Sequence, residues 1–290
     1  MMNVILHTGA HRCATTSFQE YLRQNSAALT AQGIGFWGPH RTRTGLFHGI
    51  QPGPASVTGR NLARRARGRL QIHLDNSRAA GLRHLLISDE NMIGNVRENL
   101  RRGALYSGAG ERMARFAQAF GDGIGDLALN VRSLDSYWSS ALAYAVARGH
   151  RLPTAAQLAR LARAPRSWRD VITDITCAMT GVRLHVVPFE TFGARPEAQL
   201  AALTGVDAPR THARVRLNAS LCLDDLRASL APQIAAGLPQ ASGRWRPFDA
   251  AQTAALRETY ADDMMWLAGG ADGLATLATD PEKLAAGPNP

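Results

Sequence analysis

The chain has 290 residues, of which 45% are hydrophobic and 19% charged, and its net charge is +10. These proportions exclude a disordered chain, and no apolar run reaches the ~20 residues that a membrane-spanning helix needs. A chain of this length can bury one large core, or one core with a small lobe. The positive charge predicts attraction to anions: nucleotides, polyanionic glycans, or nucleic acid bound without sequence preference.

The N-terminus and the cysteines indicate a cytoplasmic protein without a metal centre. The apolar run at residues 1–6 is far too short for a secretory signal peptide, and Arg12 follows it closely. Cys13, Cys177 and Cys222 are odd in number and widely scattered, with neither zinc-ligand spacing nor the pattern of a disulfide framework. The nine histidines show no metal-ligand spacing either. We therefore expect reduced thiols and no bound metal.

Short apolar runs alternate with helical patterns along the chain. Each run is bounded by Gly, Asp or Pro, as buried strands usually are. In chain order, the predicted strands are residues 4–7, 34–37, 84–88, 127–132 and 183–188. The alternation predicts an α/β fold with a central parallel sheet of about five strands and helices on both faces.

Two amphipathic helices are distinct in the sequence, each with a predicted capping box at its N-terminus. Thr16 and Gln19 form the box of the first helix, and Asp249 and Gln252 form that of the second. The two apolar faces are, in order, Phe18, Tyr21, Leu22 and Leu29, then Leu256, Tyr260, Met264 and Leu267.

The segments between and after these elements set the expected domain boundaries. Residues 38–59 combine Gly, Pro and His with little periodicity, which predicts a loop or lid. Residues 269–290, rich in Gly, Ala and Pro, predict a loosely ordered C-terminal tail. Because there is no internal repeat or low-complexity tract, we expect residues 1–268 to form a single domain.

Residues 4–19 have the pattern of a strand, a turn and the start of a helix. A turn that ends at a helix N-terminus presents unpaired backbone N–H groups and the positive end of the helix dipole, so it can bind an anion. Small side chains let a phosphate approach the backbone, and Arg12 adds a permanent charge. The predicted phosphate loop spans residues 8–17. Its contact residues are Gly9, Ala10, His11, Arg12, Cys13, Ala14, Thr15, Thr16 and Ser17.

This loop does not match the Walker A pattern Gly-x-x-x-x-Gly-Lys-Ser/Thr. Counted from Gly9, Ala14 takes the place of the second glycine and Thr15 that of the lysine, which disfavours ATP or GTP hydrolysis. The loop resembles instead that of the PAPS-dependent sulfotransferases, Gly-x-x-Lys-Thr/Ser-Gly-Thr-Thr, with Gly9, Thr15 and Thr16 on the pattern. The resemblance implies a P-loop-like nucleotide-binding fold, PAPS as the donor, PAP as the product, and transfer of a sulfuryl group to a hydroxyl without a metal.

Two positions of the loop depart from the family's pattern. Arg12 stands where the family has Lys, and Ala14 stands where it has Gly. Arginine keeps the charge and the donors but not the compact ammonium geometry. Donor binding is therefore the safer inference, and a catalytically silent PAP- or PAPS-binding protein remains an alternative.

A second family feature follows the predicted strand 127–132. In the family, an Arg at such a strand end and a Ser seven or eight residues further on clamp the 3′-phosphate of the donor. Arg132 with Ser140, or with Ser139, fits this arrangement. The guanidinium fork suits a phosphate, and the hydroxyl would reach it from the first turns of the next helix. Three later segments, residues 186–192, 214–220 and 245–249, resemble the family less specifically.

Two carboxylates follow the predicted strand 84–88. The carboxyl ends of parallel strands line the ligand crevice of open α/β sheets. Because sulfuryl transfer to a hydroxyl benefits from a base, Glu90 is the candidate proton acceptor and Asp89 is its substitute. The competing interpretation is that one of the two simply caps a helix.

The resemblance leaves the acceptor open: a carbohydrate, a lipid or another small molecule, with an anionic glycan or an anionic lipid among the candidates. We expect residues 38–80 and 150–170 to line its pocket. The stretch 41–83 is the most basic, and Arg64, Arg65, Arg67 and Arg69 form either a solvated helix face or a patch for an acidic acceptor. A basic nucleic-acid-binding protein is a further alternative, weakened by the sparse aromatics near this cluster and the lack of a recognised motif.

Overall fold

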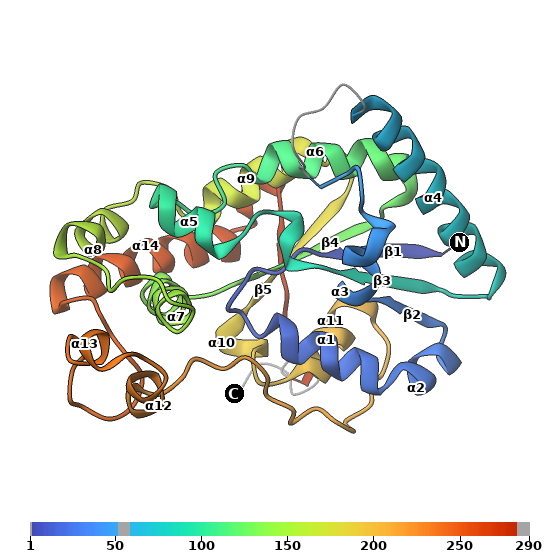
Figure 1. Cartoon of the computed structure of the whole chain (residues 1–290). Coiled ribbons are helices and arrows are strands. Elements are labelled where there is room, and N and C mark those ends of the chain that lie inside the picture. The colour runs from blue at the N-terminus through green and yellow to red at the C-terminus, as the bar shows by residue number, and fades with distance from the viewer. Residues whose placement is uncertain (1, 52–58, 283–290) are drawn as a thin grey trace, which may run out of the picture.

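A computed structural model describes residues 2–51 and 59–282, except for the side chains of residues 59–61. At its centre lies one six-stranded parallel sheet with the order β2-β3-β1-β4-β5-β6 (Figure 1). The strands are β1 Asn3–His7, β2 Ile34–Trp37, β3 His84–Ser88, β4 Asp126–Val131, β5 Arg183–Pro188 and β6 Thr276–Leu277. The predicted α/β class with a parallel sheet is confirmed, and the five predicted strands agree with β1–β5 to within one residue.

Helices cover both faces of this sheet (Figure 1). On one face lie α4 Gly59–Ala79, α6 Ala109–Phe120 and α9 Trp168–Ala178, and on the other lie α1 Thr15–Gln24, α2 Ser26–Ala31 and α11 Pro196–Thr204. Val4 and Leu6 of β1 pack into the first core, whereas Ile5 between them packs into the second. Because both faces are buried, the strands appear in the sequence as continuous apolar runs.

The remaining helices are mostly short and surround the ends of the sheet. They are α3 Pro39–Arg41, η1 Thr42–Leu46, η2 Glu90–Met92, α5 Val96–Arg102, η3 Gly121–Gly123, α7 Leu134–Val146, α8 Ala155–Ala162, α10 Phe189–Phe192, α12 Leu223–Ala228, α13 Pro232–Ala235, α14 Ala250–Ala268 and η4 Ala271–Gly273. In Figure 1, α5, α7 and α8 lie to the left of the strands, on the side toward which β1 and β4 run. Within the described ranges, no helix is both long and apolar enough to cross a membrane.

The strand order places the ligand crevice between β1 and β4. From β1 the chain moves outward on one side to β2 and β3, and then crosses to the other side of β1 to form β4. A parallel sheet opens at its carboxyl edge where the strand order reverses in this way, and ligands of open α/β folds bind there. The loop that follows β1 and the residues that follow β4 therefore face one crevice.

The C-terminal segment differs from the expectation of a loose tail that begins at residue 269. Strand β6 extends the sheet beside β5, and Asp280 is buried, where it accepts a hydrogen bond from Arg195. The sequence concealed this strand because it is only two residues long and contains no apolar run. The prediction is thus wrong for residues 269–282, and residues 283–290 lie outside the described part of the chain.

Two local predictions are also corrected. Residues 39–46, predicted as loop or lid, form α3 and η1, while residues 52–58 of the same segment lie outside the described part. The capping box predicted at Thr16 is absent: α1 begins at Thr15 after Ala14, with no side-chain cap. The box of Asp249 and Gln252 at the start of α14 is confirmed.

Candidate functional site

The loop predicted to bind phosphate, residues 8–17, joins β1 to α1 at the carboxyl edge of the sheet. Gly9 has a φ of 96°, and a Cβ at this position would lie 2.8 Å from the Cβ of Glu90, so both conformation and space require glycine. Arg12 and Ala14 also adopt the left-handed conformation, with φ of 63° and 62°. The family has glycine where this chain has Ala14, and the left-handed backbone explains why glycine suits that position.

Six consecutive amides of the loop, those of residues 12–17, donate to no acceptor in the described part of the chain. The amides on either side are satisfied. His11 N–H donates to the hydroxyl of Tyr106 at 3.0 Å, and Phe18 N–H donates to the carbonyl of Ala14 at 3.0 Å. A run of unpaired amides at a helix N-terminus is the arrangement that binds a phosphate or sulfate group.

The polar side chains of the loop hold it in shape. Thr15 is buried and its hydroxyl donates to the carbonyl of Ala10 at 2.8 Å, so it stabilises the turn. Ser17 accepts from the amide of Leu217 at 2.9 Å, and Thr16 accepts from Asn218 at 3.1 Å. These contacts hold the segment around Leu217 against the loop.

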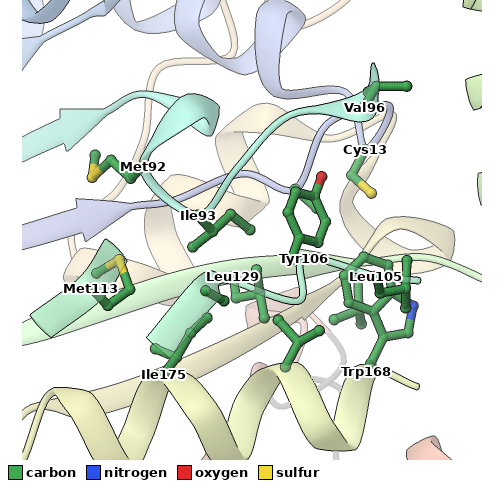
Figure 2. Packing of buried hydrophobic residues seen from close by; sticks show 14 of the residues in the cluster. Cys13, Met92, Ile93, Val96, Leu105, Tyr106, Met113, Leu129, Trp168 and Ile175 are labelled. Carbon is green, nitrogen blue, oxygen red and sulfur yellow. The ribbon is translucent and has the colours of Figure 1, made fainter. Parts of the chain in front are cut away.

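Cys13 contributes its backbone only. Its side chain lies in the core next to Tyr106, as Figure 2 shows. Burial raises the pKa of the Cys13 thiol to about 12, so the thiol stays protonated and unreactive at neutral pH. The Tyr106 ring belongs to the same core, and its hydroxyl holds the amide and the ring of His11.

A cavity of about 350 Å³ opens over the loop. It is lined by His11, Arg12, residues 14–17, Glu90, Val96, Arg132, Ser140, Tyr144, Phe189, Glu190, Gly193, Ala194, residues 216–220 and Arg244. Most of the predicted site residues therefore meet in one place. Gly9, Ala10, Cys13 and Ser139 do not line the cavity.

Arg12 and Arg132 both line the cavity and contact each other. Arg12 donates to Ser140 at 3.0 Å and to Ser220 at 3.2 Å, and Arg132 donates to the carbonyl of Arg12 at 2.8 Å. Arg132 also stacks on Phe189, with 4.1 Å from the guanidinium carbon to the ring centre.

These two guanidinium groups have no carboxylate partner among the described residues. Arg132 is only 7% exposed, and its buried Nε has no hydrogen-bond acceptor. Burial, together with the charge of Arg132, lowers the pKa of Arg12, yet a guanidinium remains charged at neutral pH. Because an unpaired buried cation is costly, this arrangement favours an anionic ligand.

The structure distinguishes the two candidate serines of α7. Ser140 lies between Arg12 and Ser220 and lines the cavity. Ser139 donates to the carbonyl of Asp135, one turn earlier, and faces an adjoining cavity of about 120 Å³. Ser140 is therefore the better partner for a ligand held by Arg132.

Asp89 is a structural residue. It is fully buried, accepts from the Asn91 amide at 3.0 Å as the cap of η2, and accepts from Thr42 at 2.6 Å. Arg43 donates to the same carboxylate with both Nε and Nη2. With its oxygens occupied in this way, Asp89 is not placed to serve as a substitute base.

Glu90 also lines the cavity. Its Oε1 accepts from Arg43 at 2.9 Å and its Oε2 accepts from Gln19 at 3.0 Å. Burial raises the pKa of Glu90, but His11, Arg43 and the hydrogen bond from Gln19 outweigh burial, so the pKa lies below its ordinary value. Glu90 is therefore ionised at neutral pH.

Several lining residues were not predicted individually from the sequence. Tyr144 and Glu190 lie on α7 and α10, and Arg244 lies in the loop before α14. Arg216 and Ser220 belong to a segment that resembled the family only weakly. Each is brought to the cavity by the tertiary fold, and composition alone gives no signal for it.

The expected acceptor segments lie elsewhere. No described residue of 38–80 or 150–170 lines the 350 Å³ cavity. Arg64, Arg65 and Arg67 are exposed on α4, which agrees with a solvated helix face.

In comparisons with known proteins, the chain matches no family model and no curated protein sequence. The resemblance to the PAPS-dependent sulfotransferases therefore depends on the loop and on Arg132 with Ser140. The chemistry of the cavity adds a constraint of its own: it suits a ligand with more than one anionic group.

Proposed function

We propose that this protein is a PAPS-dependent sulfotransferase that transfers a sulfuryl group to an acceptor hydroxyl. The observation that carries the proposal is a pair of guanidinium groups without a carboxylate partner among the described residues, half-buried Arg12 and buried Arg132, beside six free amides. PAPS has two separated anionic parts, the 5′-phosphosulfate and the 3′-phosphate. The loop amides with Arg12 offer one place for an anion, and Arg132 offers another. Such a site suits this donor better than it suits a nucleotide with a single phosphate chain.

Each anionic part has a natural place in the cavity. The loop amides and Arg12 would bind the phosphosulfate, and Arg132 with Ser140 would bind the 3′-phosphate. During transfer the acceptor oxygen forms a bond to sulfur, the bond between sulfur and the bridging oxygen of the 5′-phosphate breaks, and PAP leaves. Donors fixed in advance around the leaving phosphate stabilise the charge that builds there. Glu90, which lines the same cavity, would take the proton of the acceptor hydroxyl.

The alternative of a silent PAP- or PAPS-binding protein has an observation in its favour. The guanidinium of Arg12 points to Ser140 and Ser220 and stacks on Tyr144, 4.8 Å from the ring centre. A catalytic cation must reach the bridging oxygen, so this orientation would have to change when the donor binds. Turnover of PAPS separates the two possibilities.

The proposal is tested by ligand-dependent melting and by donor turnover. We expect PAP to raise the melting temperature more than AMP, ATP or GTP, because only PAP places a phosphate at Arg132. A ligand at 100 times its dissociation constant adds about 2.7 kcal/mol to the free energy of unfolding, which is readily measured. Equal shifts with PAP and AMP would refute the donor assignment, and PAP binding without PAPS turnover with any acceptor would favour the silent protein.

A further inference from the structure

Arg43 belongs to η1, a segment that the proposed reaction does not use, yet it contacts both carboxylates after β3. Its Nη2 lies 2.7 Å from Oδ1 of Asp89 and 2.9 Å from Oε1 of Glu90. Asp89 is fully buried and is held on its other side by the hydroxyl of Thr42. The guanidinium is therefore fixed by an anion that cannot move, although 40% of the Arg43 side chain is exposed.

The carboxylate of Glu90 is in turn held from two elements. Arg43 of η1 binds one oxygen and Gln19 of α1 binds the other. A carboxylate oxygen accepts more than one hydrogen bond, so both oxygens keep capacity for a ligand. Glu90 is also a close neighbour of the phosphate loop, since a Cβ added at Gly9 would lie 2.8 Å from the Cβ of Glu90.

We infer that Arg43 is a positioning residue for Glu90: anchored on buried Asp89, it holds the Glu90 carboxylate ionised and aimed into the cavity. This inference rests on the proposed role of Glu90 as the proton acceptor. It extends that role by identifying Arg43 as the residue that keeps Glu90 charged and in position.

The charges around Glu90 explain why such a residue is needed. The titratable or charged groups near it are His11 of the loop, His7 of β1, Arg43 of η1 and the adjacent Asp89, which shares the guanidinium of Arg43; Gln19 of α1 is neutral. Asp89 carries a like charge next to Glu90 in a largely buried place. Two neighbouring carboxylates without a cation raise the pKa of one of them, so loss of Arg43 would let Glu90 take up a proton and lose its function as a base.

The experiment compares Arg43→Gln and Arg43→Lys with wild type. Arg78→Gln is the matched control, because Arg78 forms an ion pair of 2.6 Å with Asp75 on the surface of α4, away from the cavity. The first measurement is the titration of the Glu90 side-chain carboxyl carbon by NMR in glutamate-labelled protein, with the signal assigned by Glu90→Gln. The second is the pH profile of PAP release from PAPS with water as the acceptor.

We expect Arg43→Gln to raise the titration midpoint of Glu90 by about one to three pH units. The acid limb of the pH profile should move by the same amount, while the rate at high pH returns toward wild type. Arg43→Lys should show a smaller rise, because an ammonium lacks the fork that spans both carboxylates. Arg78→Gln should change neither measurement.

An unchanged Glu90 midpoint in Arg43→Gln would overturn the inference. If that variant does not fold, Arg43→Lys decides, and a wild-type midpoint with a wild-type acid limb overturns it again. A raised midpoint with an unmoved acid limb would show a structural contact without a role in transfer, and would also count against the inference. If wild type neither binds PAP nor consumes PAPS, the proposed function fails instead, whatever the NMR titration shows.

Discussion

The two walls of the cavity differ in how their charges are compensated. On the wall formed by the loop and α7, Arg12 and Arg132 contact hydroxyls, a carbonyl and aromatic rings, and no described carboxylate. The second wall is formed by Glu90 of η2, and behind it Arg43 of η1, which does not line the cavity, binds two carboxylates at once. The positive charge of the first wall is available to an anionic ligand. On the second wall, the charge of Arg43 is balanced by the carboxylates of Asp89 and Glu90.

This difference separates what each wall can do for a reaction. Unpaired guanidinium groups and free amides bind and stabilise anions, so the first wall suits the donor and the leaving phosphate. A carboxylate held ionised by a cation accepts hydrogen bonds and protons, so the second wall suits a hydroxyl. The comparison therefore predicts that substitutions on the first wall change nucleotide affinity and that substitutions on the second change turnover.

The largest expected effect tests the second wall. Glu90→Gln should reduce sulfuryl transfer by about 10²–10⁴-fold, because general-base assistance is typically worth that much. PAP affinity should stay at the wild-type level, since the proposed donor contacts include no carboxylate. Turnover is measured as PAP release from PAPS and affinity by calorimetry.

Wild-type turnover in Glu90→Gln would remove Glu90 from the reaction, and since Asp89 is fully occupied, His11 would be the next candidate. A large fall in the melting temperature would instead assign Glu90 a structural role through Gln19 and Arg43.

The next effect tests the first wall. Arg132→Ala should weaken PAP binding by about 10- to 150-fold, because a hydrogen bond to a charged group contributes about 1.5–3 kcal/mol. AMP, which has no 3′-phosphate, should bind the variant as it binds wild type. An equal loss for both nucleotides would mean that Arg132 acts only by supporting the carbonyl of Arg12.

Arg12→Ala should weaken PAP and AMP alike, because the loop is expected to hold the 5′-phosphate of both. Arg12→Lys keeps the charge and restores the residue found in the family, so it should retain binding and raise turnover. Calorimetry with both nucleotides and a PAPS turnover assay measure this pair. If Arg12→Ala binds PAP as tightly as wild type, the loop is not the phosphosulfate site.

The parts of the fold and of the site that sequence could predict are those encoded by neighbouring residues. Strand β3 carries a continuous apolar run at residues 85–87 because both of its faces are buried, and the proposed phosphate loop presents consecutive unpaired amides. Strand β6 is two residues long and has no such pattern. Its position is set by pairing with β5, and the residues around β6 in the sequence do not indicate that pairing.

The missed or undecided features depend on contacts between distant segments. Arg43 gains its role from Asp89 and Glu90, more than 40 residues away, and it lies in a segment with no helical or strand pattern. Ser139 and Ser140 are adjacent in sequence, but they point about 100° apart on α7. Only the packing of that helix against the loop decides that Ser140 faces Arg12.

His7, at the end of β1, is hydrogen-bonded to residues of both neighbouring strands, and its burial gives a prediction about stability. Its ring nitrogens lie 2.7 Å from Ser88 Oγ on β3 and 2.7 Å from Asn130 Oδ1 on β4. Burial lowers the pKa of His7 from 6.5 to about 4. Because the unfolded chain binds this proton more readily, the stability due to neutral His7 is lost as pH falls from about 6.5 to about 4, by up to about 3 kcal/mol.

The measurement is the free energy of unfolding at pH 7 and pH 4.5 for wild type and His7→Gln. His11 and His84 also have lowered pKa values, so the informative quantity is the difference in pH dependence between the two proteins. His7→Gln should lose less stability on acidification than wild type does. Equal losses would mean that His7 does not link folding to pH.

The smallest expected effect concerns the backbone conformation of the loop at Ala14, on the first wall. Ala14 has a φ of 62°, a left-handed conformation that costs a residue with a Cβ about 1 kcal/mol relative to glycine. Ala14→Gly should therefore raise the free energy of unfolding by up to about 1 kcal/mol. The matched control is Ala254→Gly, at an exposed position of α14. That substitution should lower the free energy of unfolding by a similar amount, because glycine is unfavourable within a helix.

Chemical denaturation of both variants measures the two changes, and their opposite signs are the test. Should Ala14→Gly destabilise the protein as Ala254→Gly does, the left-handed turn would not be the conformation that the loop adopts in solution. The amides of residues 12–17 would then lose the arrangement on which the proposed donor site depends.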